Sequence, residues 1–241
     1  MLRNKIINAK RIIFLIKDKF NVTMSLSYFY SYLKKINLTH KKVYLKKQPY
    51  SNKKYKIIKN IFFKQIKNID KDEIYSIDET AVYLNSINNH GWAIKGQKCI
   101  IKDKNKQIYN KKYSLSMAIS NKKVISYVLH EKSINGEKYL DFIKKIVDEH
   151  GNKNTLLMDN ATIHKTKIFT EYCKEANVNV LYNIPYNPES NPIEMIFCPI
   201  KKFIKSNNTK SITAINDSID DYIKNISKDS LKKMFNKSLC L

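Results

Sequence analysis

Two short apolar runs in this sequence each end in an aspartate, and both runs have the length of a buried β-strand. The first is Ile74–Ile77, followed by Asp78, and the second is Thr155–Met158, followed by Asp159. A carboxylate at the end of a buried strand is costly unless it is paired or holds a metal. The two aspartates therefore constrain the fold and are the first candidates for a functional site.

The segments around these runs alternate between strand and helix patterns. Strands are expected at 74–78, 113–119, 123–129, 155–159 and 179–182, and helices near 136–149, 165–175, 193–206, 211–226 and after 229. The order β-β-β-α-β-α-β-α predicts an α/β domain in which a hairpin precedes parallel strands. With 241 residues, of which 43% are hydrophobic, the chain can bury one such core plus a small accessory unit.

A third acidic residue, Glu194, lies at the start of a predicted helix beyond the last strand. Taken singly, each acid has an ordinary role: Asp78 can begin a turn, and Asp159 can cap a helix. For Glu194 the ordinary role is a capping box, with Asn191 as the cap and Pro192 at the first helical position. Taken together, the topology can bring the three carboxylates to one place. Such oxygen ligands can hold two divalent cations about 3.5–4 Å apart and support phosphodiester chemistry.

The charge of the chain points to a polyanionic partner. The formal net charge is +24, and the acidic residues within positions 1–70 are only Asp18 and Asp70. A basic N-terminal segment ahead of an α/β domain is typical of a DNA-binding arm ahead of an enzyme. A solvated, lysine-rich helical surface explains the charge equally well, so charge alone does not decide.

The N-terminal segment carries two helix patterns joined by a short turn. The first covers residues 4–19, and the second begins after Ser25. The residues expected on the inner side of the second helix are Leu26, Phe29, Tyr30, Leu33 and Ile36. This arrangement fits a helix-turn-helix, although any small αα-hairpin gives the same pattern. The residues expected to contact DNA are Ser25, Ser27, Tyr28, Lys34, Lys35, Lys41 and Lys42.

The chain is expected to have three parts: a helix-turn-helix domain at 1–48, a linker with a helix at 49–71 and an α/β domain at 72–241. Its four cysteines form no Cys-x-x-Cys pair, which is typical of reduced thiols in an intracellular protein. No apolar run approaches membrane-spanning length, so no membrane partner is expected. The expected compartment is the nucleus of a eukaryotic host, or the cytoplasm and nucleoid of a prokaryotic one.

Three blocks of the sequence resemble the signature blocks of mariner-like DDE transposases and related bacterial insertion-sequence enzymes. The blocks are 76–80, 158–164 and 185–194, and each contains one of the three acids. Residues 91–97, which include Trp92, resemble the tryptophan-containing hairpin that those enzymes place after their first catalytic strand. The resemblance covers roughly residues 72–206 of the chain.

The resemblance implies an RNase H-like fold, a mixed sheet flanked by helices, with Asp78, Asp159 and Glu194 as the catalytic and metal-binding triad. The implied cofactor is Mg²⁺, with two ions expected and Mn²⁺ as an alternative. The implied reaction nicks transposon ends and joins the freed 3′-hydroxyl to target DNA. The implied partners are double-stranded DNA and a second copy of the chain, as a homodimer. Side chains expected to support the triad or to contact DNA are Asn160, His164, Trp92 and Lys95.

Residues 20–30 are similar to the second helix-turn-helix of the family's DNA-binding region, which makes 25–36 the expected recognition helix. Because the family normally has two such units, the resemblance implies a chain truncated at its N-terminus. Two other functions stay open at this point. A remnant without catalysis would act only as a DNA-binding protein, and another RNase H-like nuclease would cleave DNA without joining strands.

Overall fold

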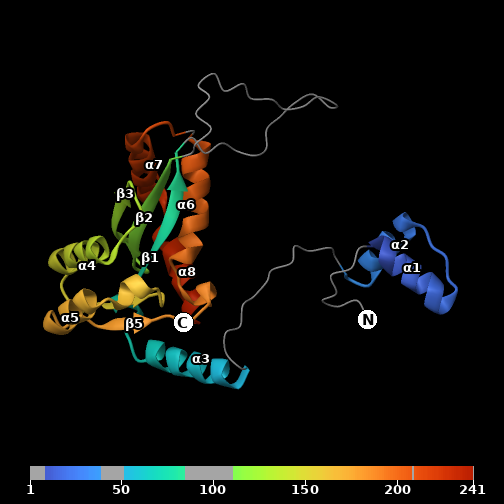
Figure 1. The fold of residues 1–241 in the computed structure, drawn as a ribbon, viewed down its shortest axis with the longest axis horizontal. Helices are drawn as coiled ribbons and strands as arrows, with labels where there is room; N and C mark the ends of the chain where they lie inside the picture. Colours follow the sequence, from blue (N-terminus) through green and yellow to red (C-terminus); the bar gives the residue numbers. More distant parts are fainter. Residues whose placement is uncertain (1–8, 39–51, 85–110, 208, 241) are drawn as a thin grey trace. The chain divides into compact units, whose positions relative to one another are not determined.

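The structure is a computed structural model that describes residues 9–38, 52–84, 111–207 and 209–240 (Figure 1). The chain divides into two compact units, residues 1–48 and residues 49–241. Helix α3 (Asn52–Lys67) is part of the second unit, because its side chains Phe62 and Ile66 are buried in that unit's core.

The first unit contains two helices among its described residues, α1 (Ala9–Phe20) and α2 (Leu26–Lys35). Ser25 caps α2, because its side-chain oxygen accepts a hydrogen bond from the backbone N–H of Tyr28 at 3.1 Å. The sequence predicted that the second helix begins after Ser25, because serine is a common residue type at the cap position.

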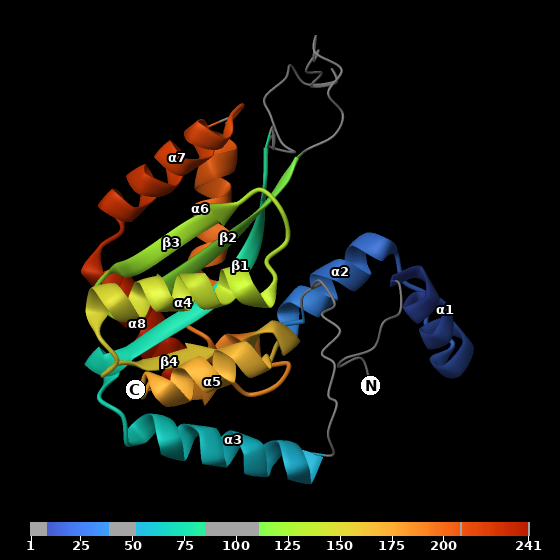
Figure 2. The same ribbon diagram turned by 60° about the vertical axis from the view of Figure 1, so that its left-hand side comes forward.

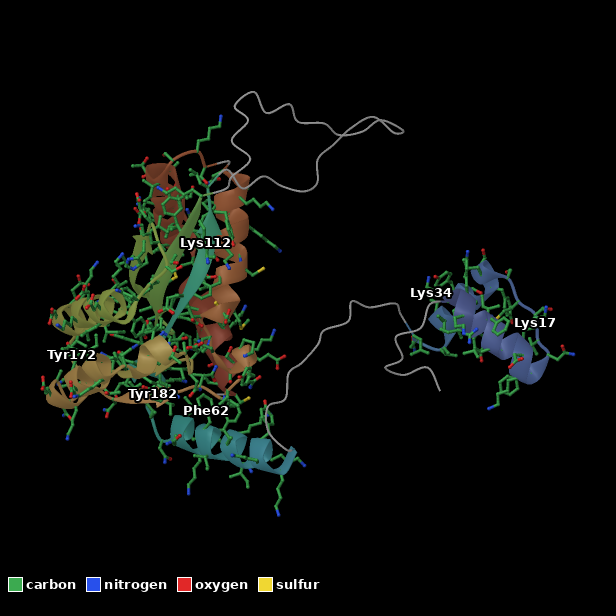
Figure 3. All side chains as sticks on the ribbon, viewed as in Figure 1. Lys17, Lys34, Phe62, Lys112, Tyr172 and Tyr182 are labelled. Carbon is green, nitrogen blue, oxygen red and sulfur yellow. The ribbon has the colours of Figure 1, made fainter. Side chains whose placement is uncertain are left out.

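The burial of α2 differs from the expectation. Within the described residues, Phe29 is its one buried side chain, at 2% exposed. Three members of the expected inner side are exposed instead, namely Leu26, Tyr30 and Ile36. A single partner helix covers only a narrow strip of α2, so one aromatic ring takes most of the contact. Lys17 and Lys34 extend from the surface of this unit (Figure 3).

The second unit is built on a five-stranded mixed sheet in the order β3-β2-β1-β4-β5. Its strands are β1 (Ile74–Tyr83), β2 (Lys112–Ile119), β3 (Val124–His130), β4 (Thr155–Met158) and β5 (Val180–Tyr182). Strand β2 pairs antiparallel with β1 and with β3, whereas β4 lies parallel to β1 and to β5. This arrangement is the predicted hairpin followed by parallel strands, and it confirms the fold class.

Helices cover both faces of the sheet (Figure 2). One face packs against α6 (Glu194–Ser206), α7 (Ile212–Asn225) and α8 (Lys228–Leu239), together with α3. The other face packs against α4 (Gly136–His150) and α5 (Lys167–Glu175). Two separate core clusters result, because alternate residues of each strand point to opposite faces.

This alternation decides where the side chains of β1 and β4 point. Ile74 and Leu157 belong to the cluster on the α6 face, whereas Tyr75 and Ile77 belong to the cluster on the α4 face. Asp78 has the same parity as Ile74 in β1, so its side chain faces α6.

Two element boundaries differ from the expectation. The helix expected at 165–175 is divided into a 3-10 turn, η2 (Thr162–Lys165), and α5, because Thr166 between them is extended at φ −64° and ψ 151°. Strand β1 runs beyond the expected end and reaches Tyr83, because it pairs with β2 along the whole length of that strand.

Gly151 ends α4. Its φ of 76° is the left-handed conformation that favours glycine, and its backbone N–H donates a hydrogen bond to the Val147 carbonyl at 2.7 Å. None of the helices in the described ranges is both long and apolar enough to cross a membrane.

Candidate active site

The register of the sheet places Asp78 and Asp159 side by side. Strands β1 and β4 pair in parallel, with Ser76 opposite Leu157. The same register continued by two residues sets Asp78 opposite Asp159, just beyond Ser76 and Leu157, the last pair between β1 and β4. Ligands of open α/β sheets gather at this edge. The two acids are therefore neighbours because of strand pairing.

Asp78 is buried, at 7% exposed. Its Oδ1 accepts a hydrogen bond from the backbone N–H of Glu79 at 2.7 Å, and its Oδ2 accepts one from Asn191 Nδ2 at 3.1 Å. Burial raises the pKa of Asp78 to about 8. The N–H of Glu79 opposes this rise, and the carboxylates of Glu79, Glu194 and Asp159 add to it. Both hydrogen-bond donors are neutral, and within the described residues no cationic side chain forms an ion pair with this carboxylate.

Asn191 connects two segments of the site. Its side chain is 1% exposed, donates to Asp78 and accepts a hydrogen bond from the Ser76 hydroxyl. Ser76 Oγ in turn accepts one from the backbone N–H of Ile193 at 3.1 Å. The alternative in which Asn191 caps α6 does not hold, because the cap position of α6 is Ile193, without a side-chain cap. The amide instead satisfies a buried carboxylate, which would be costly to leave without a donor.

Glu194 is the first residue of α6, and its side chain is accessible. The contacts of Ser76 with Asn191 and Ile193 fix the chain just before Glu194, so α6 begins beside the first half of β1. Partial burial raises the pKa of Glu194, the charge of Lys201 lowers it, and the charge of Asp159 raises it.

The three carboxylates line one cavity of about 530 Å³ at this edge of the sheet. Its remaining walls come from the segment after β4 and from the loop 183–191. The acids belong to segments that are far apart in the sequence, so the fold assembles them. Separate turn and cap roles do not explain this convergence.

Asp159 differs from Asp78 because it has a cationic partner. Its Oδ1 lies 2.8 Å from His164 Nδ1 and also accepts a hydrogen bond from the backbone N–H of Ala161 at 2.8 Å. The hydrogen bond to His164 is the largest cause of a lowered pKa for Asp159. Both contacts use Oδ1, and 47% of the side chain is exposed, so the carboxylate keeps an open side.

His164 is fully buried between two acids. Its Nε2 lies 3.2 Å from Glu79 Oε2, while its Nδ1 contacts Asp159. Burial lowers the pKa of His164, but the hydrogen bonds to Asp159 and Glu79 outweigh it and raise the pKa to about 10. The ring is therefore an imidazolium that donates to both carboxylates, and it packs on the Tyr139 ring with centroids 4.2 Å apart. A buried His164 is placed to support Asp159 and is not placed to contact DNA.

Asn160 and Lys165 fasten the neighbouring loop. Asn160 Nδ2 donates to the backbone carbonyl of Asn183, and Asn160 Oδ1 accepts a hydrogen bond from Lys165 Nζ at 2.7 Å. The Lys165 ammonium also lies over the Tyr182 ring, 4.6 Å from its centroid. Asn160 therefore acts on the site by holding the backbone that follows β5.

The loop between β5 and α6 is held by buried polar side chains. Ser190 Oγ donates to Asn183 Oδ1 at 2.6 Å, and Asn187 Nδ2 donates to Ser190 Oγ at 3.1 Å. Tyr186 lies within this loop with a φ of 58° and an exposed ring. A tyrosine with positive φ is strained, so the surrounding hydrogen bonds must hold the loop in place.

The donor set fits a divalent cation of the magnesium kind. Magnesium takes oxygen ligands and is commonly held by one or two carboxylates plus substrate phosphates. Asp78, Asp159 and Glu194 offer such oxygens around one cavity, and both hydrogen-bond donors to Asp78 are neutral. Among the described residues, no group of three or more histidine, cysteine, aspartate or glutamate side chains is already gathered closely enough to hold a metal. Closure around a cation would therefore require the carboxylates to approach one another.

The site residues predicted from the sequence fall into three groups. The structure brings together Asp78, Asp159, Glu194, Asn160 and His164. The residues Ser25, Ser27, Tyr28, Lys34 and Lys35 belong to the first unit. The residues Trp92, Lys95, Lys41 and Lys42 lie outside the described residues.

Sequence reasoning missed Ser76, Glu79 and Lys165. A signal existed for Ser76, which is a polar residue in an apolar run and has the parity of Asp78. No local signal existed for Glu79, because its partner His164 is 85 positions away along the chain.

Comparisons with known proteins agree with this geometry. The profile of the DDE superfamily endonucleases matches residues 73–216, more than half of the chain. The Mos1 strand transfer complex superposes with a TM-score of 0.72 at 15% identity, over 96% of this chain and 75% of that chain. The mariner Mos1 paired end complex with Mg superposes with a TM-score of 0.72 at 15% identity, over 94% of this chain and 74% of that chain. The catalytic domain of Mos1 mariner transposase superposes with a TM-score of 0.62 at 15% identity, over 81% of this chain and 93% of that chain.

Comparison with curated protein sequences gave no match. At 15% identity the structural likeness shows the fold, which is the RNase H-like arrangement of the Mos1 catalytic domain. The sequence profile carries the family assignment. The chain therefore belongs to the DDE superfamily endonucleases, as its resemblance to mariner-like transposases predicted.

Proposed function

We propose that the protein is a transposase that cuts DNA strands and transfers them to a target, with Asp78, Asp159 and Glu194 as its catalytic carboxylates. The observation that carries this proposal is their convergence on one cavity from β1, β4 and α6. Membership in the DDE superfamily endonucleases supports the cleavage step. The likeness to a Mos1 strand transfer complex supports transfer as the second step.

The same carboxylates would hold divalent cations, Mg²⁺ or alternatively Mn²⁺. When bound, two such ions supply an activated water or hydroxyl and a counter-charge for the leaving oxygen. Asp78 contributes a buried carboxylate that Asn191 keeps oriented. Asp159 contributes one that the His164 imidazolium keeps ionised. The Mos1 paired end complex with Mg supports this choice of metal.

The DNA partners would be the ends of a mobile element and the target duplex. We assign residues 1–48 to DNA binding, 49–71 to the connection and 72–241 to catalysis. The exposed surface of α2 carries Ser27, Tyr28, Lys34 and Lys35, a set suited to phosphate and groove contacts. Action within the cell, on two ends held by a homodimer, follows by analogy with the paired end complexes of Mos1.

The test is a nicking and joining assay with purified protein, Mg²⁺ and a duplex that carries the inverted repeats flanking the gene. We expect the wild-type protein to nick the repeat ends and to join the freed 3′-hydroxyl to a second duplex. Asp78→Asn and Glu194→Gln should abolish nicking and leave DNA affinity close to the wild-type value. Glu189→Gln is the matched control, because Glu189 is an exposed acid of the loop 183–191 and does not line the cavity.

The outcomes separate the competing functions. Undiminished nicking by Asp78→Asn would contradict the catalytic assignment. A wild-type protein that binds the repeats and never nicks them is a DNA-binding remnant. A protein that nicks and never joins is another kind of RNase H-like nuclease.

A further inference from the structure

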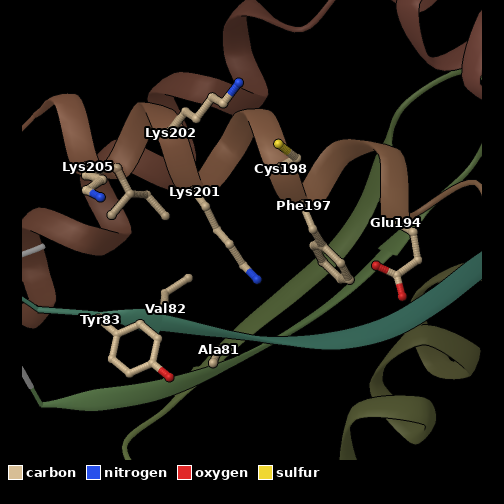
Figure 4. A pocket seen from close by; sticks show the side chains of 10 residues that line it. Ala81, Val82, Tyr83, Glu194, Phe197, Cys198, Lys201, Lys202 and Lys205 are labelled. Carbon is tan, nitrogen blue, oxygen red and sulfur yellow. The ribbon is translucent and has the colours of Figure 1, made fainter. Parts of the chain in front are cut away.

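A second cavity, of about 660 Å³, lies between α6 and the far half of β1 (Figure 4). We name it the α6 groove and define it by Tyr83 on β1 and by Glu194, Cys198, Lys201, Lys202 and Lys205 on α6. Glu194 lines this groove and also the cavity of the three carboxylates. The groove therefore begins at the carboxylate site and leads away from it along the helix.

One face of α6 points into the groove. Glu194, Cys198, Lys201 and Lys205 follow one another at intervals of three or four residues, which places them in a single stripe. Figure 4 shows Lys201 reaching from the helix toward β1, while Lys202 extends outward at the rim. The charge of Lys201 lowers the pKa of Glu194, the acid at the carboxylate end of the groove.

Beyond Glu194 at its one end, the groove is lined by positive charge. Within the described part of the chain, no ion pair joins Lys201, Lys202 or Lys205 to an acid. Other acids of this region are on the adjacent helix α7, which carries Asp217, Asp220 and Asp221. A helical face that is merely solvated gains from mixing the two signs, whereas α6 after Glu194 carries lysines and no acid.

The apolar lining of the groove comes from both elements. Phe197 on α6 and Val82 on β1 are nearly fully buried, at 3% and 2% exposed, whereas Tyr83, whose ring Figure 4 shows on the side of β1 away from Lys201, is 45% exposed. Figure 4 places Tyr83 and Lys205 at the end of the groove opposite Glu194. A groove lined by three lysines is suited to the phosphates of a nucleic-acid strand.

We infer that the α6 groove holds the DNA strand that leads away from the cleavage position, with its phosphates on Lys201, Lys202 and Lys205. This inference rests on the proposed function, because it names the path of the same substrate. Lysine contacts to phosphates do not distinguish one base from another. The groove therefore fixes the position of the strand at the carboxylates and leaves sequence recognition to other parts of the protein.

Cys198 offers a direct test, because its thiol is exposed in the middle of the groove. The test protein carries Cys99→Ser and Cys240→Ser, which leaves Cys198 and the buried Cys173. It is incubated with repeat-end duplexes that carry one thiol-tethered phosphate each, placed in turn along both strands. We expect disulfide capture at one or two adjacent phosphates of a single strand, a few nucleotides from the cleavage position. A protein with Cys198→Ser that keeps Cys240 is the control, and its capture should show no such preference.

Capture that is absent, or equal at all phosphates of both strands, would overturn the inference. The capture step needs no catalysis, so the same experiment is run with Asp78→Asn added. Position-specific capture by the protein that keeps Asp78, together with no nicking by that protein, would support the groove and refute the proposed catalysis. Nicking without position-specific capture would support the proposed catalysis and refute the groove.

A second experiment measures how much the charge of the three groove lysines contributes to DNA affinity. Lys201, Lys202 and Lys205 are replaced together by alanine and compared with alanine at Lys145, Lys153 and Lys174, three exposed lysines of the α4 and α5 side. For the groove variant we expect the slope of log affinity against log salt to fall by about 2–3 and the Kd to rise about tenfold or more. The control variant should bind close to wild type. Equal behaviour of the two variants, with both shown by circular dichroism to be folded, would overturn the inference.

Discussion

Asp78 on β1 and Asp159 just after β4 are the same residue type in the same register, yet their surroundings are electrostatically opposite. Asp78 is buried among neutral donors, and its pKa is raised to about 8. Asp159 is half exposed and contacts the His164 imidazolium, which lowers its pKa. One carboxylate is therefore already compensated by the protein, and the other is not. The pairing of the strands brings the two aspartates together. The side chains that contact each aspartate decide which of the two carboxylates depends on an added cation.

The largest effect is expected from removing the cation behind Asp159. His164→Ala leaves Glu79 and Asp159 facing each other across the space of the lost ring and should destabilise the fold by about 3–5 kcal/mol. The raised pKa of His164 means that its stabilisation is fully present below pH 6.5 and is lost as the pH rises through about 10. Urea unfolding at pH 6.5 and above pH 10 measures both points.

The matched control for this variant is Lys167→Ala, which breaks the exposed pair Lys167–Glu171 and should cost less than about 0.5 kcal/mol. If His164→Ala costs no more than this control, the buried ring is not a charged support of Asp159.

A smaller effect of opposite sign is expected at Asp78. Because its pKa rises from 3.8 to about 8 on folding, the free energy of unfolding decreases as the pH rises between these values. Asp78→Asn removes this penalty and should stabilise the metal-free protein by roughly 2 kcal/mol at pH 8 and hardly at all near pH 4. Guanidinium unfolding in the presence of a chelator measures the difference. Equal stabilisation at both pH values would show that the charge of Asp78 is not the cause.

Added Mg²⁺ sharpens the same comparison. It should raise the melting temperature of the wild-type protein, because a ligand that binds only the folded state stabilises it. It should leave Asp78→Asn unchanged, because that variant lacks the carboxylate that most needs a counter-charge. An equal response of both proteins would show that the ion binds elsewhere.

The support behind Asp78 is neutral, so its removal should cost less than the removal of His164. Asn191→Ala deprives Asp78 and Ser76 of a hydrogen-bond partner and should destabilise the protein by about 1–2 kcal/mol. In Asp78→Asn the same change should cost less, because an uncharged amide tolerates a lost donor better. A double-mutant cycle measures this coupling. Strict additivity would mean that Asn191 acts only through Ser76 and the chain before α6.

The sequence was sufficient to predict the sheet and the convergence of the acids. Short apolar runs that end in Asp78 and Asp159 predict buried strands by length, and parallel pairing then sets their ends together. Glu194 could be linked to them only through its block and through the resemblance to a family. These predictions depend on local patterns, which are the part of folding that a single sequence displays.

The support of each acid could not be predicted in the same way. Asn191 has a good local role as a helix cap, and only the folded chain shows that Asp78 takes its amide instead. Glu79 meets His164 because β1 brings it to the α4 face, across 85 positions of sequence. Such contacts are set by tertiary geometry. Sequence alone favours the local role of a residue, such as a helix cap, over a contact with a residue far along the chain.

The smallest effect tests whether the support of Asp159 extends beyond His164. Lys165 also lowers the pKa of Asp159, although its charge is the weakest of the causes and its side chain is exposed. Lys165→Gln should therefore raise the carboxyl pKa of Asp159 slightly in an NMR titration and change stability by less than about 0.5 kcal/mol. Lys167→Gln is the matched control, since Lys167 is paired with Glu171 on α5. A large rise of the Asp159 pKa in Lys165→Gln would mean that Asp159 depends on an exposed lysine. Salt and DNA phosphates can screen the charge of such a lysine. The electrostatic contrast between Asp159 and Asp78 would then hold only in the protein without DNA.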